Sequence, residues 1–198
     1  MFHLYSLKVR FSVIGSELWS DEEGFDESVS SFGVTGICGS GIIEAIAGMF
    51  LSGLISADGV IDGSMAERSS GLFLEGRTWS FVLHNGEQKI SVTQNDVRQI
   101  QLAKAALYAG VKLLMDRAGI DTVDRIRLAG AFGSHIDPKY AMVIGLIPDC
   151  LFENVGSAGN SAGTGARIAL LNVAARREIE KVARKIEKME TAVEPKFQ

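Results

Sequence analysis

The sequence predicts an α/β fold in which helices flank a layered sheet, with a β-hairpin at one side. Segments with helical periodicity alternate with short apolar runs along the second half of the chain. Within residues 78–92, two alternating runs flank Asn85-Gly86, which is a strong hairpin signal. Ten of the 22 glycines lie in three clusters, at residues 33–41, 130–133 and 156–166, where they mark turns or loops that approach a ligand.

The composition excludes several classes of protein. With 198 residues, 46% of them hydrophobic and 22% charged, the chain can form one large or two small domains with a real core. A formal charge of -4 argues against a nucleic-acid surface, and the apolar stretches are too short and broken to span a membrane. Cys38 and Cys150 lie far apart in sequence, so we expect reduced thiols in a cytoplasmic protein, with no zinc or iron–sulfur site.

The first third of the chain predicts few regular elements. Residues 1–14 contain LKVRFSVIG, whose alternation is typical of a strand, and the acidic residues 15–35 indicate a surface loop. Ser40 is the expected N-cap of a helix that runs to about Ser52. Residues 56–77 are rich in Gly, Ser and Asp and therefore indicate a loop.

The longest predicted helix begins at a capping-box-like pair, Thr93 and Asp96, and stops at Gly119. VDRIRLAG, residues 123–130, indicates a short strand. Asp137-Pro138 is typical of a helix start, because proline suits the first helical position.

The last third predicts a connection and then helix. Residues 148–158 form the connection, with at most one short strand. Asn160 or Ser161 begins a helix that runs to about Arg177. We expect the tail to continue as a solvated helix or to turn into a last strand.

Two glycine-rich segments stand where a ligand could meet bare backbone. In LAGAFGSH, Gly130 and Gly133 follow a buried strand, where a flat ring such as adenine could lie on the main chain. A tight turn with positive φ explains the same glycines, and both interpretations remain open. In TGICGSGIIEA, Gly39 and Gly41 precede a helix start that suits an anion, although close helix packing explains Gly41 equally well.

The remaining motifs favour structural roles. SAGNSAGTGARIALL contains small residues at a helix start, which favours close packing over binding. We expect Cys38 to be a small buried residue, and His135 to be a hydrogen-bonding surface residue more than a general base. The sequence contains neither a P-loop nor a complete dinucleotide fingerprint.

Four segments together resemble one family. Over about residues 33–175 they occur in this order: TGICGSGIIEAIAGMFLSGLI, TQNDVRQIQLAKAALYAGVKLLMDRAGI, RIRLAGAFGSHIDPKYAMVIGLIPD and AGNSAGTGARIAL. They resemble the C-terminal part of the ATP-dependent reductive activators of corrinoid proteins. These activators belong to the actin-like (ASKHA) group, together with sugar kinases, heat-shock chaperones and actin. The resemblance implies an actin-like, ribonuclease H-like ATPase lobe over residues 33–198, with residues 1–32 as the end of the preceding lobe and an acidic loop.

The resemblance also implies a function. Full-length members carry a [2Fe-2S] ferredoxin domain and use ATP with Mg²⁺ to return Co(II) corrinoid to Co(I) for methyl transfer. On this basis the late adenosine motif supplies the contacts Gly130, Ala131, Phe132 and Gly133. We assign the helix-start residues to the same nucleotide site, namely Gly39, Ser40, Gly41, Asn160 and Ser161. The implied partner is a corrinoid protein or corrinoid-dependent methyltransferase, and a homodimer is an expected assembly.

The chain departs from the family pattern in two respects. It lacks the ferredoxin cysteine pattern, and it lacks the early phosphate loops that hold the phosphates and Mg²⁺. We therefore expect a C-terminal fragment that is inactive alone, with the catalytic and magnesium-binding residues outside this chain. Two alternatives are half of an actin-like small-molecule kinase and a non-catalytic interaction module.

Overall fold

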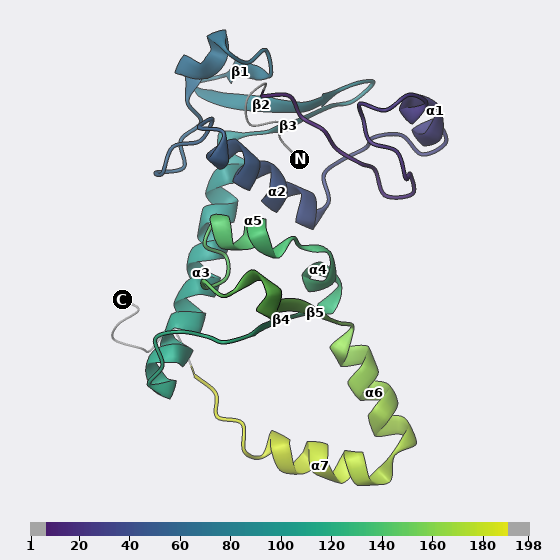
Figure 1. The fold of residues 1–198 in the computed structure, drawn as a ribbon, viewed down its shortest axis with the longest axis vertical. Coiled ribbons are helices and arrows are strands. Elements are labelled where there is room, and N and C mark those ends of the chain that lie inside the picture. Colours follow the sequence, from purple (N-terminus) through teal and green to yellow (C-terminus); the bar gives the residue numbers. More distant parts are fainter. Residues whose placement is uncertain (1–6, 190–198) are drawn as a thin grey trace.

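The structure is a computed structural model that describes residues 7–189. Its upper part holds an antiparallel sheet with helices α1 (Phe25–Val29) and α2 (Gly39–Leu51), and its lower part holds a parallel strand pair with short helices (Figure 1). The long helix α3 (Gln94–Ala118) runs beside both parts, and two terminal helices project from the lower end. The predicted α/β class is confirmed.

The upper sheet contains the predicted hairpin and one strand that we did not predict. Its order is β1 (Leu72–Glu75), β2 (Thr78–Asn85) and β3 (Lys89–Val92), all antiparallel. Residues 86–88 join β2 to β3, so the turn is one residue longer than an Asn-Gly turn. β1 lies inside residues 56–77, where we expected a loop, and the 3-10 helix Gly63–Glu67 precedes it. The four residues LFLE become a strand because β2 offers them backbone partners, which no local pattern indicates.

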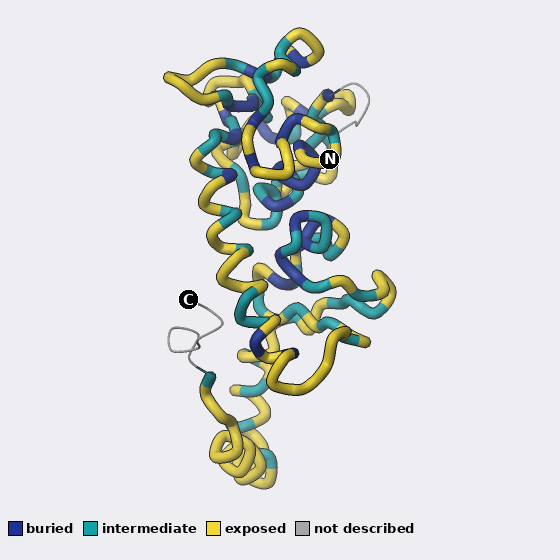
Figure 2. Tube along the Cα trace, turned by 90° about the vertical axis from the view of Figure 1, so that its left-hand side faces the viewer, coloured by how far each residue is buried: buried dark blue, intermediate teal, exposed yellow. Residues whose placement is uncertain are grey.

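The main core lies where α2 meets this sheet. Six of the 13 residues of α2 are buried, and Ala47 and Met49 are fully buried. They share one apolar cluster with Leu54 of the following turn, Phe81 of β2 and Val92 of β3. Figure 2 shows the buried residues concentrated in this upper part, whereas most of the lower end is exposed. Burial on several sides is typical of a helix inside a core, and it explains the apolar run IIEAIAGMF.

Helix α3 has the predicted boundaries because its two ends are set locally. Thr93 Oγ1 accepts a hydrogen bond from the Asp96 N–H over 3.2 Å, and the Asp96 carboxylate accepts one from the Thr93 N–H over 2.8 Å. Gly119 ends the helix in the left-handed region, with φ 67°. Within residues 7–189, neither α3 nor any other helix is long and apolar enough to cross a membrane.

The lower part is built on two parallel strands, β4 (Ile126–Ala129) and β5 (Val155–Gly159). Helix α4 (Gly130–His135) follows β4 directly, where we predicted a tight turn or a segment that approaches a ligand. Helix α5 (Pro138–Val143) comes next, and the Asp137 carboxylate caps it by accepting from the Lys139 N–H over 2.8 Å, as the Asp-Pro pair predicts. A 3-10 turn, Phe152–Asn154, leads into β5.

The terminal arm consists of α6 (Ser161–Leu171) and α7 (Val173–Ala183). The single helix predicted to run to about Arg177 is wrong, because Asn172 adopts an extended conformation (φ -132°, ψ 110°) and breaks it. Neither α6 nor α7 contains a buried residue. The expected solvated helix continues to Ala183, and a strand at the very end of the chain would lie outside the described residues.

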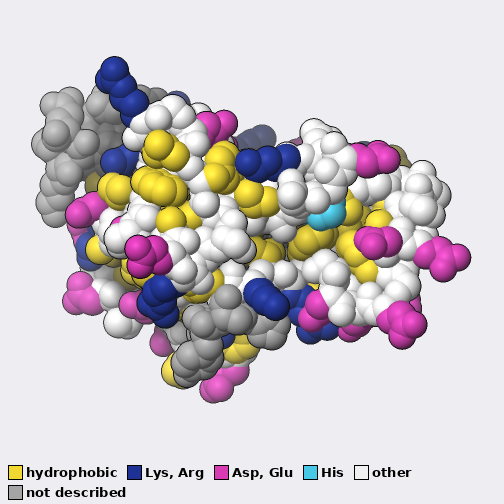
Figure 3. Space-filling view, turned by 90° about the horizontal axis from the view of Figure 1, so that it is seen from above, with side chains coloured by type: hydrophobic (Ala, Val, Ile, Leu, Met, Phe, Trp, Pro, Cys, Tyr) yellow, Lys and Arg dark blue, Asp and Glu magenta, His cyan; other side chains and the backbone are white. Residues whose placement is uncertain are grey.

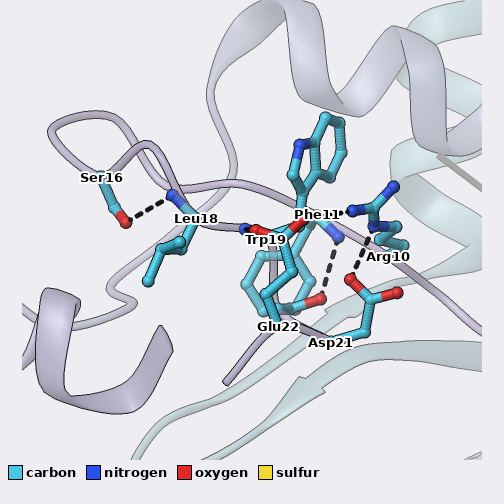
Figure 4. Close-up of polar contacts among 8 residues, drawn as sticks. Arg10, Phe11, Ser16, Leu18, Trp19, Asp21 and Glu22 are labelled. Atoms are coloured by element: carbon cyan, nitrogen blue, oxygen red, sulfur yellow. Dashed lines mark hydrogen bonds and ion pairs between the residues drawn. The ribbon is translucent and has the colours of Figure 1, made fainter. Parts of the chain in front are cut away.

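The N-terminal segment is not the predicted strand. Residues 7–14 contribute only isolated bridge positions, at Val9 and at Ser12, which pairs with Trp19, and residues 1–6 lie outside the described part. Arg10 holds the segment in place: its guanidinium lies 4.5 Å from the centre of the Trp19 ring and donates to Asp21 over 2.6 Å and to Glu22 over 2.8 Å (Figure 4). These side chains order the loop without a strand.

The predicted acidic loop carries negative charge at one end of the molecule. Residues 15–35 contain six acidic residues and no Lys or Arg. Viewed from above, Asp and Glu side chains gather at the end that carries α1 (Figure 3). The short helix α1 lies within this loop and buries Phe25 and Val29, which anchor it.

Candidate functional site

The parallel strands bring two of the predicted segments to one edge of the sheet. Ala129 of β4 pairs with Gly159 of β5, so both strands end at the same level. Helix α4 begins at Gly130 directly after β4, and Asn160 caps α6 directly after β5. Open α/β folds bind ligands beyond the carboxyl ends of their strands, which makes this edge the candidate site.

The GAFG segment contains two glycines with different roles. Gly130 has φ +91°, and a Cβ built there would meet no atom within 4 Å. Gly133 is buried, and a Cβ there would lie 3.0 Å from the carbonyl carbon of Leu128. Ala131 and Phe132 between them are exposed, and 51% of Phe132 is accessible. Conformation therefore explains Gly130, close packing explains Gly133, and the two residues between them face solvent.

Ser134 bonds within α4 and also joins α4 to β5. Ser134 Oγ donates to the carbonyl oxygen of Gly130 over 2.8 Å, and Ser157 Oγ of β5 donates to Ser134 Oγ over 3.3 Å. His135 ends the helix and is exposed, as expected of a surface histidine. The position of the GAFG segment is thus set by both strands.

The start of α2 differs from the prediction. The N-cap is Cys38 rather than Ser40, because Cys38 Sγ accepts the Gly41 N–H over 3.3 Å. Cys38 is exposed, so the expectation of a buried residue is wrong: a capping side chain must turn toward the open first turn of its helix. A Cβ on Gly41 would lie 3.2 Å from Cys38 Sγ, so the cap itself explains why residue 41 has no side chain.

The two glycine segments meet at one contact. A Cβ built on Gly39 would lie 3.0 Å from Cε2 and 3.1 Å from Cδ2 of Phe132. The ring of α4 therefore lies against the bare backbone of the first residue of α2. Residues 93 positions apart in sequence come together here, and no local pattern in the sequence indicates the contact.

The start of α6 is the third predicted segment. Asn160 Oδ1 accepts the Gly163 N–H over 2.9 Å, which confirms Asn160 as the cap, and Ser161 Oγ donates to the carbonyl oxygen of Ala158 over 3.0 Å. Both side chains are exposed. β5 places them next to the end of β4, but their polar atoms already bond within the turn.

A group of titratable residues between α2 and α5 was not predicted. Burial raises the pKa of Glu44, and the carboxylate of Asp137 raises it further. Burial also raises the pKa of Tyr140, with further contributions from Asp137 and Glu44. The sequence does contain a signal for this group, because Glu44 is the only carboxyl residue in an apolar helix. A carboxyl group that is buried with its helix loses hydration, which raises its pKa.

The site is an exposed edge rather than a closed cavity. A groove of about 470 Å³ lies instead between α3 and the segment after α5, where Tyr108, Lys112 and Pro148 are among its lining residues. None of the nine predicted site residues lines it. Among residues 7–189, no three His, Cys, Asp or Glu side chains lie close enough together to hold a metal ion.

Comparisons with known proteins agree with this architecture. The family model described as "C-terminal domain of RACo the ASKHA domain" matches residues 2–198. The corrinoid activation enzyme RamQ of Eubacterium limosum is 38% identical, over 82% of this chain and 29% of RamQ. The solved structure of a reductive activator for corrinoid, iron-sulfur protein is 34% identical with a TM-score of 0.73, over 82% of this chain and 27% of that one.

These matches confirm the predicted resemblance and the actin-like fold. The chain spans less than a third of the length of either relative. The order of its segments, the paired strand ends and the family match lead to one conclusion: the chain belongs to the family of RACo C-terminal ASKHA domains.

Proposed function

We propose that this chain is the adenosine-binding portion of an ATP-dependent reductive activator that returns a Co(II) corrinoid protein to Co(I) for methyl transfer. The observation that carries the proposal is the contact between Phe132 and Gly39, which joins two glycine segments at the carboxyl edge of parallel strands. The names of the two relatives, a corrinoid activation enzyme and a reductive activator, support the corrinoid part of the proposal.

In the proposed site, each segment has a distinct task. Gly130 and Ala131 offer main chain and a methyl group to the nucleoside, and Phe132 offers an exposed ring. The first turn of α2 offers the backbone N–H groups of Gly39 and Ser40 and the positive end of a 13-residue helix, whereas the Gly41 N–H bonds to Cys38 Sγ. Gly133 has no side chain, which lets α4 lie close to Leu128 and so fixes the position of the segment. Asn160 and Ser161 border the site from the end of β5.

The described residues do not supply the other groups that the full activity needs. They offer no cluster of carboxylates for Mg²⁺. The chain has two cysteines, whereas a [2Fe-2S] cluster takes four thiolates. We therefore assign no step through Mg²⁺ or the cluster to this chain, and place both in the longer proteins of which this family forms the C-terminal part.

The proposal includes a partner, a location and an assembly. The partner is a corrinoid protein or corrinoid-dependent methyltransferase. A cytoplasmic location is supported by Cys38 and Cys150, which are both free thiols. The exposed apolar side chains of the arm, among them Leu171 at 84% and Leu170 at 75%, support an assembly that covers them, such as a homodimer.

Alkylation of the two cysteines tests the nucleotide part of the proposal. Cys38 is adjacent to Gly39, whereas Cys150 precedes β5 and so lies toward the opposite end of that strand. The 198-residue chain is treated with iodoacetamide at increasing ATP or ADP, and peptide mass spectrometry measures each rate. Because the chain supplies part of the site, we expect a Kd of about 1 mM, equivalent to about -4 kcal/mol.

The expected result is slower labelling of Cys38, by about half when the nucleotide concentration equals Kd, at an unchanged rate for Cys150. Equal slowing of both thiols would indicate a general effect of the nucleotide and contradict the placement. Unchanged labelling of Cys38 at nucleotide concentrations well above this Kd would contradict it as well.

A further inference from the structure

The ring of Phe132 occupies an unusual position for an apolar side chain. It takes no part in the apolar cluster that holds α2, α5 and the antiparallel sheet together. About half of it, 51%, is accessible, although burying a phenylalanine side chain is worth roughly 1.5–3 kcal/mol. Its location is therefore not explained by the core of the described residues.

The contact that Phe132 makes leaves little room for a side chain at position 39. Carbon atoms in favourable contact lie about 3.5–4.0 Å apart, whereas a Cβ on Gly39 would come to 3.0 Å from Cε2 of the ring. A methyl group at position 39 would require the ring or the start of α2 to move by a few tenths of an ångström, and a larger side chain such as valine would require more. Gly36, three residues earlier, differs because a Cβ there would meet nothing within 4 Å.

Both elements that meet at this contact are anchored elsewhere. Helix α4 is held on the strands by the hydrogen bond from Ser157 of β5 to Ser134 and by the burial of Gly133 against Leu128. Helix α2 is held by its buried residues, including Ala47 and Met49. The ring of Phe132 lies between two anchored helices, so its contact with Gly39 limits how closely the start of α2 can approach α4.

We propose that Phe132 is a positioning residue, whose contact with Gly39 fixes the start of α2 relative to the GAFG segment and thereby sets the opening that a nucleoside enters. This inference rests on the proposed function for the identity of the ligand. The positioning itself is a property of the free protein, so it can be tested without a nucleotide.

The test uses Cys38, because this thiol caps α2 and precedes Gly39. The variants are Phe132→Ala, Gly39→Val and the double variant, each compared with the wild-type chain. Phe152→Ala is the matched control for an exposed phenylalanine, at 60%, outside the site, and Gly36→Val is the control for a glycine with open space. Circular dichroism confirms folding, and Phe132→Leu replaces Phe132→Ala if that variant is unfolded.

Without nucleotide, we expect Phe132→Ala and Gly39→Val each to raise the Cys38 labelling rate about fivefold. We expect the double variant to have the same rate as either single variant, and the two controls to have the wild-type rate. The effects are not additive because valine at position 39 acts by displacing a ring that the double variant lacks. The inference would be overturned if both folded single variants had the wild-type labelling rate. It would also be overturned if the rate increase in the double variant were the product of the two single increases.

A second measurement separates this inference from the proposed function. ATP or ADP protection of Cys38 is titrated in Phe132→Ala and in the control Phe152→Ala, and we expect weaker affinity by about fivefold in the first and wild-type affinity in the second. If the non-additive labelling is present but nucleotide protects no variant, the positioning role stands and the proposed function fails. If nucleotide protects every variant equally and the labelling effects are independent, the proposed function stands and the positioning role fails.

Discussion

Arg176 Nε donates a hydrogen bond to the carbonyl oxygen of Ala169 over 2.9 Å, across the helix break at Asn172. The Asn172 side chain accepts the Ala175 N–H over 3.0 Å and caps the second helix. Because neither α6 nor α7 contains a buried residue, these local bonds, rather than packing, hold the bend between them.

Asn172→Ala removes the acceptor for the Ala175 N–H. We expect faster hydrogen exchange at that amide and a loss of about 1 kcal/mol from the first turn of α7. Amide exchange measured by NMR tests this, with Asn172→Asp as the control because aspartate caps equally well. Unchanged exchange at Ala175 in the alanine variant would contradict the capping role.

Thr93→Ala removes half of the capping box of α3. The cost is about 1 kcal/mol, which corresponds to a Tm lower by roughly 2–4 °C in a chain of this size. Thermal unfolding followed by circular dichroism measures the change. Thr122→Ala in the exposed loop after α3 is the control, and an equal shift in both variants would show that the cap is not the cause.

Gly133→Ala and Gly165→Ala should change stability in opposite directions. The new methyl at position 133 would lie 3.0 Å from backbone carbon of Leu128, which cannot rotate away, so we expect a lower Tm. The methyl at position 165 within α6 meets open space, and alanine is favoured over glycine in a helix by up to about 1 kcal/mol. Differential scanning calorimetry compares them, and a stabilised Gly133→Ala would refute the packing role.

Glu44→Gln should flatten the pH dependence of stability. Burial, and then Asp137, raise the pKa of Glu44 above its ordinary value of 4.5. Between that value and the folded-state pKa, the folded protein binds more protons than the unfolded chain, so the free energy of unfolding falls as the pH rises. Glutamine has no proton to lose, and we expect a smaller decline in Tm as the pH rises above 4.5.

Thermal unfolding at a series of pH values measures this difference between wild type and Glu44→Gln. The exposed Glu67 in the 3-10 helix is the matched control, because Glu67→Gln removes a carboxylate that the protein does not bury. A decline that is as steep in Glu44→Gln as in wild type would contradict the proposed cause.

Local interactions made several elements predictable from the sequence. The cap of α3 depends on Thr93 and Asp96, three residues apart, and the hairpin depends on two strands joined by a short turn. Asp137 and Asn160 likewise cap helices through N–H groups two and three residues away. Interactions of such short range are encoded within one segment, so the sequence determined them together with the α/β class and the family resemblance.

Contacts between distant segments decided the rest. β1 is a strand because β2 pairs with it, and residues 7–14 are not a strand because Arg10 ties them to Trp19, Asp21 and Glu22 instead. The sequence predicted both glycine segments of the candidate site, but their contact through Phe132 and Gly39 arises only when α4 and α2 are packed. Hydrophobic periodicity and capping residues predict where a helix or strand begins and ends. The separation of two helices depends instead on all the side chains that pack between them.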